Sequence, residues 1–564
     1  MSNKPLKNTT EIKNLRDLVR SNAATFGDMN LYTYIENKTE KTISYREFGE
    51  NINRLGTAFF QLGLMGKHIA VIGESHPAYM TTYHAATHGG GVIVPLDKEI
   101  TDDEVVNFLN LSKADAVVYT RGQNDRIAHF ADRCPEVKYF IPVAADEETV
   151  VHDKIKSFDE LLSMGKKALE QNIRDFVDCA IDKDKMCAIL FTSGTTGTSK
   201  GVMLSQHNLA RNTLAAAESM GHVPSGTKLM SVLPMHHTYE TTTVHMAAHY
   251  VGGSIFCNED LKYVSKNINA WKPDLLVLVP LFVETMHKKV WEAIRAKGVE
   301  KKVRMAMKIS NGASKIGINL KKKLFGEITA AFGGNLKGIV CGAAPLNPQL
   351  ITDFRAFGIN IQEGYGITEC SPLVAVNTYG KERLRSVGKT VRFCQVKIDI
   401  DNPELGTGEI LVKGDNVMLG YYNNEEATSE VMTDDGHFRT GDIGYMDKDG
   451  YLYITGRKKN VIILSNGKNI YPEEIEEYLA PSELIAECAV VGRKINDEVM
   501  ITVLIFPDAE KFEGQSGEEI HAKLKAEVDA INENLPSFKK IRHIEVRDSE
   551  FEKTTTRKIK RHKL

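Results

Sequence analysis

The sequence predicts an α/β fold: a large N-terminal domain of parallel-rich α/β subdomains and a small β-rich subdomain, then a small α/β C-terminal domain. Three observations support this prediction. Short β-rich runs alternate with helical periodicity from about residue 43 to 290. After about residue 385 the strands become short, with Gly and Asp turns. A compact tail of about 100 residues follows "GRKKN" at 456–460. The 564 residues also exceed the roughly 100–200 typical of one domain.

The first α/β stretch contains apolar runs that are typical of buried strands. Between the first two runs, "HPAYMTTYHAATHGG" at 76–90 has the pattern of a helix ended by glycines. This alternation predicts a parallel sheet covered by helices. The expected strands are at 68–75, 91–97, 114–120, 138–143 and 187–193. A second α/β stretch has expected strands at 274–280, 336–346 and 359–366.

The β-rich part and the tail complete the chain. Short strands are expected at 396–400, 408–414 and 450–457, and the tail has expected elements at 461–479, 488–494 and 500–506. We place a domain boundary near Lys459, which gives domains 1–458 and 459–564.

Composition and charge exclude several classes of protein. About 42% apolar and 26% charged residues are usual for a soluble globular protein, and a net charge of −3 argues against a general nucleic-acid binder. The N-terminal residues lack the apolar core of a signal peptide or anchor, and no run approaches the roughly 18 apolar residues of a membrane span. The eight cysteines are scattered, without CxxC pairs, so reduced thiols and a cytoplasmic location are expected.

The run "FTSGTTGTSKG" at 191–201 follows a buried apolar stretch. Glycines let backbone N–H groups converge on an anion, while hydroxyls and a lysine add donors and charge. These are the needs of a polyphosphate site, although a surface turn would also fit the loop alone. The spacing is not that of the common G-x4-GK-[ST] loop. The predicted phosphate-binding residues are Thr192, Ser193, Gly194, Thr195, Thr196, Gly197 and Lys200.

The run "QEGYGITE" at 362–369 places Tyr365 between Gly364 and Gly366. We expect its ring to lie exposed beside a tight backbone, where it could stack on a base. Glu369 is a hard oxygen ligand suited to Mg²⁺, and Thr368 can donate to a phosphate. A turn with an ordinary surface glutamate is the alternative.

Three further runs contain candidate site residues. "RTGDIG" places Asp442 in a glycine-flanked turn, where a carboxylate could accept two hydrogen bonds from a ribose diol. "KTTTRKIKR" contains Lys558 within a strongly basic tail, which could simply be solvated. "LPMHHTYE" contains His236 and His237, but adjacent side chains rarely converge on one metal ion.

Taken together and in order, these motifs resemble those of the adenylate-forming superfamily of acyl-CoA synthetases, peptide-synthetase adenylation domains and luciferases. The resemblance rests on "TSGTTGTSKG", "LPMHHTYE", "GAAP", "EGYGITE", "RTGDIGYMDKDGYLYITGRKKNVI" and "KTTTRKIKR", and covers essentially the whole chain. The H-x-x-E form of His237 to Glu240 is most similar to long-chain fatty acyl-CoA synthetases.

The resemblance implies an ATP site. Tyr365 would stack on adenine, Thr368 would contact the α-phosphate, and Glu369 would help to hold magnesium. Asp442 would bind the ribose hydroxyls, and Arg457 would also contact the nucleotide. The run "CGAAP" would form the wall beside adenine and the acyl group, with Ala343 and Ala344 at the nucleotide, and Gly342 and His237 at the acid pocket.

The resemblance also implies a mobile C-terminal domain that carries the catalytic lysine. Lys558 would bridge the attacking carboxylate and the α-phosphate, where it would neutralise charge in the transition state. Arg557 stands where the family usually has glycine, so the turn before Lys558 is left open. Lys459 aligns with the hinge at which the domain rotates between half-reactions, and Gly467 would then let the pantetheine chain pass.

The implied activity is an AMP-forming acid–thiol ligase that uses Mg²⁺, ATP and CoA on a long-chain fatty acid. Four alternatives stay open: an acyl carrier protein as acceptor, an aryl or amino acid as substrate, a non-catalytic nucleotide-binding scaffold, and a plain NTPase. Residues 301–323 carry eight basic and no acidic side chains. They form either a solvated helix face or a patch that meets anionic lipid at the inner membrane face, an acidic carrier protein or CoA phosphates.

Overall fold

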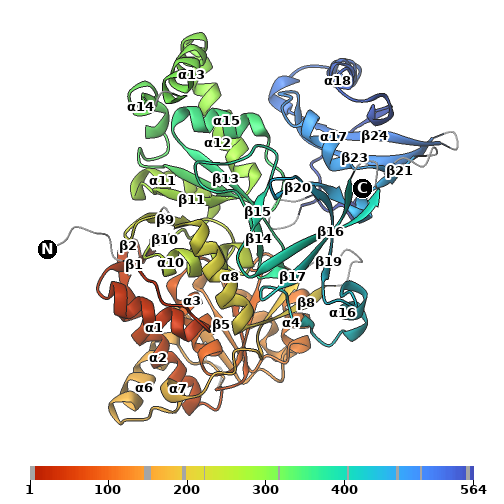
Figure 1. Cartoon of the computed structure of the whole chain (residues 1–564). Coiled ribbons are helices and arrows are strands. Elements are labelled where there is room, and N and C mark those ends of the chain that lie inside the picture. The colour runs from red at the N-terminus through yellow and green to blue at the C-terminus, as the bar shows by residue number, and fades with distance from the viewer. Residues whose placement is uncertain are drawn as a thin grey trace.

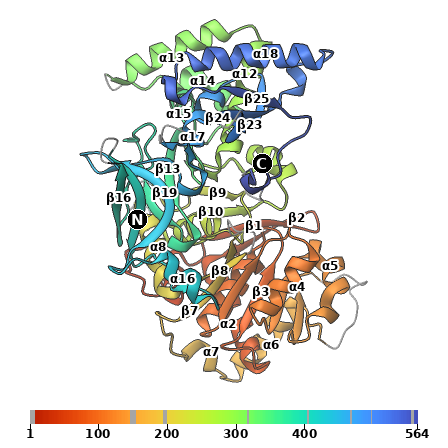
Figure 2. The same ribbon diagram turned by 90° about the vertical axis from the view of Figure 1, so that its right-hand side faces the viewer.

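Two large β-sheets with helices between and around them form the body of the molecule (Figures 1 and 2). The computed structural model describes residues 7–144, 154–192, 199–221, 223–315, 318–402, 406–464, 469–495, 498–553 and 559–564. The predicted fold class is confirmed: an α/β N-terminal part is followed by a smaller α/β unit at the C-terminus.

The seven-stranded sheet has the order β18-β8-β7-β4-β3-β5-β6. Its central strands are parallel, as expected, whereas β8 runs antiparallel to both β7 and β18. The connection from β7 to β8 is too short for a parallel crossover, which needs a dozen or more residues. The strands are β3 (His68–Ile72), β4 (Val92–Leu96), β5 (Ala116–Tyr119), β6 (Tyr139–Pro142), β7 (Met186–Thr192), β8 (Lys200–Ser205) and β18 (Gly420–Tyr421).

The thirteen-stranded sheet joins a parallel half to an antiparallel half at β13 (Asn360–Gly366). The predicted β-rich subdomain is therefore continuous with the second α/β sheet. The parallel half contains β1 (Asn30–Glu36), β10 (Ser254–Cys257), β9 (Lys228–Ser231), β11 (Leu275–Leu278) and β12 (Gly338–Cys341), with β2 (Thr39–Ser44) antiparallel at its edge. The antiparallel half contains β14 (Leu373–Val376), β15 (Gly388–Thr390), β20 (Tyr451–Arg457), β19 (Phe438–Met446), β17 (Thr407–Gly414) and β16 (Cys394–Asn402).

The helices cover both sheets and fill the space between them (Figure 2). In the first half of the chain they are α1 (Leu15–Phe26), α2 (Tyr45–Gln61), α3 (Pro77–His88), α4 (Asp102–Leu111), α5 (Asn124–Phe130), α6 (Phe158–Glu170), α7 (Asp175–Asp178), α8 (Gln206–Ser219), α9 (Thr238–Glu240), the π-helix η3 (Thr241–Ala247) and α10 (Ala248–Tyr250). Then come α11 (Val264–Trp271), α12 (Pro280–Ala296), α13 (Glu300–Lys315), α14 (Lys321–Ala330), α15 (Pro348–Phe357), the 3-10 helix η5 (Thr368–Cys370), α16 (Glu425–Val431) and the 3-10 helix η6 (Lys458–Asn460).

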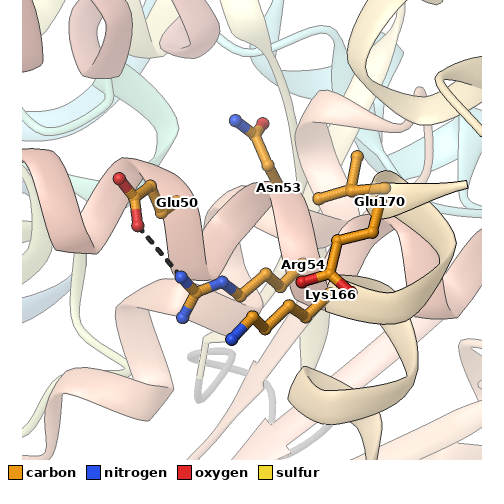
Figure 3. A pocket seen from close by; sticks show the side chains of 6 residues that line it. Glu50, Asn53, Arg54, Lys166 and Glu170 are labelled. Carbon is orange, nitrogen blue, oxygen red and sulfur yellow. Dashed lines mark hydrogen bonds and ion pairs between the residues drawn. The ribbon is translucent and has the colours of Figure 1, made fainter. Parts of the chain in front are cut away.

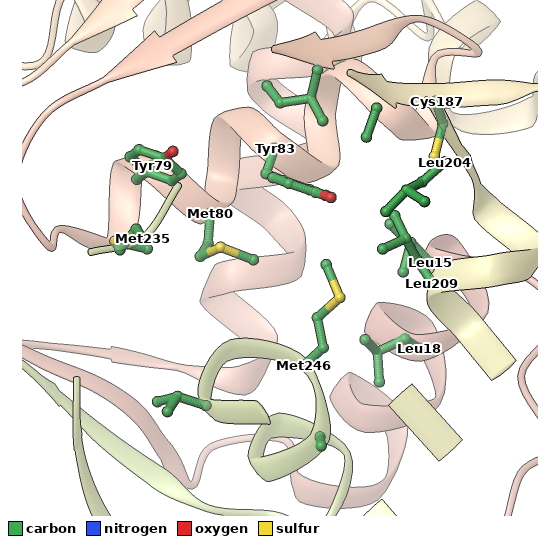
Figure 4. Packing of buried hydrophobic residues seen from close by; sticks show 14 of the residues in the cluster. Leu15, Leu18, Tyr79, Met80, Tyr83, Cys187, Leu204, Leu209, Met235 and Met246 are labelled. Atoms are coloured by element: carbon green, nitrogen blue, oxygen red, sulfur yellow. The ribbon is translucent and has the colours of Figure 1, made fainter. Parts of the chain in front are cut away.

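The core between the sheets is built around α3, whose residues are all buried. Tyr79, Met80 and Tyr83 of this helix lie among side chains from α1, α8 and η3 (Figure 4). Its threonines are satisfied within the helix, since Thr82 Oγ1 donates to the Ala78 carbonyl at 2.8 Å and Thr87 Oγ1 to the Tyr83 carbonyl at 2.9 Å. The threonine hydroxyls of this helix can therefore be buried without losing their hydrogen-bond partners.

The C-terminal unit has a separate core beneath a three-stranded sheet. It lies beside β20 in Figure 1, in blue. Its elements are β21 (Ile462–Ile463), β22 (Asn469–Ile470), α17 (Pro472–Leu479), β23 (Ile485–Ile495), β24 (Glu498–Pro507), α18 (Gly517–Asn532) and β25 (His543–Val546). Within the described ranges, no helix combines the length and the apolar character that crossing a membrane requires.

The packing of α6 on α2 depends on Gly165. A Cβ at this position would lie 1.7 Å from the Arg54 carbonyl oxygen, which is main chain and cannot move alone. We therefore expect Gly165→Ala to push the helices apart and to cost about 1–3 kcal/mol of stability. Thermal unfolding checks this, with Gly312→Ala in α13 as control. A Cβ at Gly312 meets nothing within 4 Å, so alanine there should be neutral or stabilise by up to about 1 kcal/mol. Equal melting temperatures for the two variants would contradict the packing argument.

Candidate functional site

Asp442 of β19 is the centre of the predicted nucleoside-binding residues. Its carboxylate is only 3% exposed and is held from two sides. Tyr365 Oη of β13 donates to Asp442 Oδ2 at 2.6 Å, and Arg457 Nε of β20 lies 2.9 Å from Asp442 Oδ1. Burial and the nearby carboxylate raise the pKa of Tyr365, so its hydroxyl stays a donor, and Asp442 raises the pKa of Arg457. Each carboxylate oxygen keeps a second lone pair for a ligand hydroxyl.

The expectation that the Tyr365 ring lies exposed is wrong. The ring is 7% exposed and belongs to the main core. The flanking glycines let β14 approach closely instead: a Cβ at Gly366 would lie 2.4 Å from the Pro372 carbonyl. The backbone is tight as predicted, but β14 and the bond to Asp442 enclose the ring.

The expectation that Asp442 lies in a turn is also wrong. Asp442 lies within β19, opposite Arg457 in the β19–β20 register. Gly441 precedes it with φ +70°, and the pairing of β17 with β19 is irregular between Glu409 and Leu411. Such an irregularity re-aims a side chain without ending the strand. The glycine therefore marks a bulge that directs the carboxylate toward Tyr365.

Lys200, Tyr421 and Glu369 form a second group on the predicted phosphate side. Lys200 begins β8 and lies with Nζ 4.9 Å from the centroid of the Tyr421 ring in β18. Tyr421 Oη donates to Glu369 Oε1 at 3.0 Å. Burial and Glu369 raise the pKa of this phenol, so it remains protonated. Thr192 ends β7 directly opposite Lys200.

The segment from Tyr365 to Glu369 links the two groups. It runs from the end of β13 into η5. Thr368 lies in it between Tyr365, of the predicted nucleoside group, and Glu369, of the predicted phosphate group. Several predicted residues lie outside the described ranges: Ser193, Gly194, Thr195, Thr196, Gly197, Gly467 and Lys558.

Gly342 and Ala343 follow β12 and lie beside the end of β13. A Cβ at Gly342 would lie 3.2 Å from the Gly364 carbonyl and 3.3 Å from the Tyr239 ring. Ala343 has φ +76°, in the left-handed region, and Ala344 is exposed. The ends of β12 and β13 therefore lie close together and form a wall, and the Tyr239 ring packs against one side of it.

Tyr239 contributes that ring. Its hydroxyl lies within hydrogen-bond distance of the Leu278 and Val340 carbonyls, at 3.3 and 3.1 Å. His237, two residues earlier, is half-buried and packs on the His236 ring at 4.0 Å between centroids. Burial lowers the pKa of His236 to about 3, so that ring is neutral at physiological pH. Tyr239 lies against Gly342, one of the two residues predicted for the acid pocket.

Glu240 points away from this wall into the core. It is fully buried, 3.8 Å from His245 Nε2, and burial raises the pKa of its carboxyl to about 8. Burial lowers the pKa of His245 to about 3, and this ring lies 3.2 Å from both Tyr32 Oη and Ser231 Oγ. Both groups are therefore neutral near pH 7. The glutamate of the H-x-x-E pattern has a place in the core and not at the wall formed by Tyr239 and Gly342.

Lys459 lies in η6, two residues after the Arg457 that pairs with Asp442. Its side chain is exposed overall, but desolvation by its surroundings and the nearby Arg457 charge lower its pKa. Lys458 pairs with Glu409 at 2.9 Å, and Asn460 donates to Glu473 of α17 at 2.6 Å. The predicted hinge position thus connects the nucleoside group with the C-terminal unit.

An open hollow of about 300 Å³ between α2 and α6 contains no residue of either group (Figure 3). Its charged side chains offset one another, since Arg54 pairs with Glu50 at 3.0 Å and Lys166 and Glu170 bring opposite charges. We assign it no function.

The sequence alone predicts no role for Tyr421 or Tyr239. Tyr421 lies in a two-residue strand after Gly420, and its partner is 52 residues earlier in the chain. The signal available for it was the glycine in "LGYYNN", which permits φ +140° beside Met203 and Thr428. The signal for Tyr239 was its position two residues after His237.

The chain matches two protein-family models. Residues 19–422 match the model described as AMP-binding enzyme, and residues 459–564 match the model described as AMP-binding enzyme C-terminal domain.

Individual relatives and a solved structure extend these matches. The chain is 29% identical to the long-chain-fatty-acid–CoA ligase FadD15 of Mycobacterium bovis, over 84% of this chain and 78% of that protein. It is 25% identical to the chloroplastic long-chain-fatty-acid–[acyl-carrier-protein] ligase AEE15 of Arabidopsis thaliana, over 92% and 79%. The adenylation domain of a carboxylate reductase from Mycobacterium chelonae has the same fold, with a TM-score of 0.80, 20% identity and coverage of 98% and 90%.

Glu240 makes stability depend on pH in a predictable direction. The carboxyl has a pKa of about 8 in the folded chain against 4.5 as its ordinary value. The folded state therefore holds a proton that the unfolded state loses, and stability falls as pH rises from about 4.5 to 8. Each pKa unit corresponds to about 1.4 kcal/mol, so the full effect is several kcal/mol.

We expect Glu240→Gln, which stays neutral, to remove this dependence. Its melting temperature should match the wild type near pH 5 and exceed it at pH 8.5. The exposed Glu513→Gln is the matched control and should follow the wild type throughout. Wild-type and Glu240→Gln curves that stay parallel from pH 5 to 8.5 would show that the Glu240 carboxyl is ionised in the fold.

Proposed function

We propose a function for this chain on one established premise: it belongs to the family of AMP-binding enzymes. The proposed reaction activates a long-chain fatty acid with ATP to acyl-AMP and then transfers the acyl group to CoA, releasing AMP and pyrophosphate.

One observation carries the proposal. The group Tyr365–Asp442–Arg457 and the group Lys200–Tyr421–Glu369 are joined by the five residues from Tyr365 to Glu369. The first group offers a carboxylate to a diol, and the second offers a cation and hydrogen-bonding groups to phosphates. A nucleoside triphosphate needs both, in this order along its length.

In the first step a carboxylate oxygen of the acid attacks the α-phosphorus of ATP. The bond from that phosphorus to the β-phosphate bridging oxygen breaks, and pyrophosphate leaves with the electron pair. Lys200 and, by the sequence resemblance, Lys558 would neutralise the charge that spreads over the phosphates. Thr368 would donate to the α-phosphate. Backbone and hydroxyl groups of the 192–197 loop would hold the outer phosphates.

Magnesium fits the residues present. Glu369 provides a half-buried carboxylate with one oxygen bound to Tyr421, so Oε2 is the oxygen proposed for the ion. Mg²⁺ is usually held by one or two carboxylates together with substrate phosphates, where it offsets their charge.

In the second step the CoA thiolate attacks the acyl carbonyl, the carbon–oxygen bond to AMP breaks, and AMP leaves with that oxygen. We propose that the domain of residues 459–564 turns at Lys459 between the steps, bringing Gly467 to the pantetheine path. The ion pair of Arg295 with Glu483 at 2.5 Å, which crosses the two units, is solvent-exposed. Exposed pairs contribute little stability, so they would not prevent such a rotation.

The acid is proposed to be a fatty acid because the wall beside Gly364 is uncharged. Tyr239, Gly342 and Ala343 present an aromatic ring and small groups there, which suit an alkyl chain. FadD15 is named for long-chain fatty acids, which supports the same class. All eight cysteines are free thiols, which suits the cytoplasm as the proposed location.

Pyrophosphate release tests the function. The full chain with Mg·ATP is given C2–C18 fatty acids, benzoate and amino acids, each with CoA, with an acyl carrier protein, or with neither. We expect release with long acids and sustained AMP formation with CoA. If turnover is sustained only with the carrier protein, which is the acceptor in the name of AEE15, the acceptor is a carrier protein and not CoA. ATP binding without release for any acid would refute the ligase and favour a scaffold.

Tyr421 should matter for the first step. Tyr421→Phe removes the hydrogen bond to Glu369, and a bond to a charged group contributes about 1.5–3 kcal/mol. We expect kcat/KM for pyrophosphate release to fall at least tenfold, with a melting temperature that is lower because the same bond also stabilises the fold. Tyr422→Phe alters the neighbouring phenol, which is half-buried, and should leave kcat/KM within twofold. Equal activity of both variants would remove Tyr421 from the site.

A further inference from the structure

Helix α13 has an outward face on which cations alternate with apolar side chains. At about 3.6 residues per turn, this face is opposite the side that buries Met307 and Ser310. Met305 is 65% exposed and Ile309 54% exposed, although both are large apolar side chains. The remaining members of the face are Lys301, Lys302 and Lys308, all exposed.

The same character continues into α14. Ile318, before this helix, is 49% exposed and Leu324 is 41% exposed. Lys322 and Lys323 are exposed beside Leu324. We call the outward face of α13 and these residues of α14 the tip surface. Both helices stand at one end of the molecule and pack on α12 and α15 (Figures 1 and 2).

The charge of the tip surface is not neutralised from within the described chain. Arg304 pairs with Glu300 at 2.8 Å, and Lys297 pairs with Glu327 at 3.0 Å, at the edges of the surface. Across the described ranges, the five lysines of the tip surface have no ion pair with an acidic side chain within 4 Å: Lys301, Lys302, Lys308, Lys322 and Lys323.

We propose that the tip surface docks on a membrane rich in anionic lipid. A bilayer interface offers negative headgroups to lysines and an apolar boundary to the side chains between them, so it matches both components at once. If this face were only a solvated helix surface, its lysines would be explained, but the exposure of two large apolar side chains, Met305 and Ile309, on the same face would not. A carrier protein that delivers a thiol must dock near the nucleotide groups. The tip surface does not lie there, because α12 and α15 stand between it and β13 (Figure 1). This surface is separate from the proposed active site and does not depend on it.

Vesicle flotation of the full chain tests the proposal at 0.15 M salt. We expect binding to vesicles of phosphatidylcholine with 30% phosphatidylglycerol and little binding to phosphatidylcholine alone. Because each lysine near such a surface contributes about 1 kcal/mol, Lys301→Gln/Lys302→Gln/Lys308→Gln should lower the partition coefficient at least tenfold. The control Lys166→Gln/Lys167→Gln/Lys266→Gln removes three exposed lysines elsewhere and should change it less than twofold.

A second pair of variants tests the apolar component at constant charge. Met305→Ser/Ile309→Ser should lower binding to the anionic vesicles severalfold, whereas Leu261→Ser/Tyr263→Ser, at another exposed apolar site, should not. Melting temperatures check that every variant is folded. The proposal is overturned if the wild type ignores anionic vesicles, including when it binds an acidic carrier protein instead. It is also overturned if each control loses as much binding as its matched variant.

Discussion

The buried carboxylate of Asp442 is the group on which the proposed site depends. A charge that is 3% exposed is stable only with partners, and it has two: the Arg457 guanidinium and the Tyr365 hydroxyl. The carboxylate and its two partners lie on three different strands, β19, β20 and β13, of one sheet. Loss of either partner would leave the carboxylate underpaired, which typically costs about 3–5 kcal/mol. The interaction therefore fixes the antiparallel half of the sheet against the end of its parallel half.

The same interaction lies at the junction between the two units of the chain. Arg457 ends β20, and Lys459 follows within η6 before the C-terminal unit begins. A nucleoside that hydrogen-bonds to Asp442 would therefore act two residues from the proposed hinge. On the other side, the short path from Tyr365 to Glu369 connects the nucleoside group to Lys200 through Tyr421. Nucleotide binding, magnesium and domain rotation would thus be coupled through one continuous set of contacts.

The sequence predicts many of the strands and glycine-rich segments of the proposed site, because glycines and strand periodicity are local signals. The strand before Lys200 and the tight backbone around Tyr365 both show in short runs, whereas the glycine before Asp442 predicts a turn and marks a bulge in the structure. What sequence could not provide was pairing between distant residues. The Tyr365–Asp442 bond spans 77 residues and the Tyr421–Glu369 bond spans 52. The short run around Tyr365 therefore predicts an exposed ring, and the run around Tyr421 gives no sign of its partner. The H-x-x-E pattern singles out Glu240, but its burial as a neutral carboxyl depends on the packing of η3 and β9 against it.

The central claim is that a fatty carboxylate attacks the α-phosphorus of ATP, and oxygen transfer tests it most directly. Palmitate labelled with ¹⁸O in both carboxyl oxygens is incubated with the enzyme, Mg·ATP and CoA, and the AMP is analysed by mass spectrometry. The account predicts one ¹⁸O atom in each AMP formed, because the attacking oxygen stays on phosphorus when the thiol displaces AMP. Unlabelled AMP, or ADP with phosphate as the only products, would contradict it.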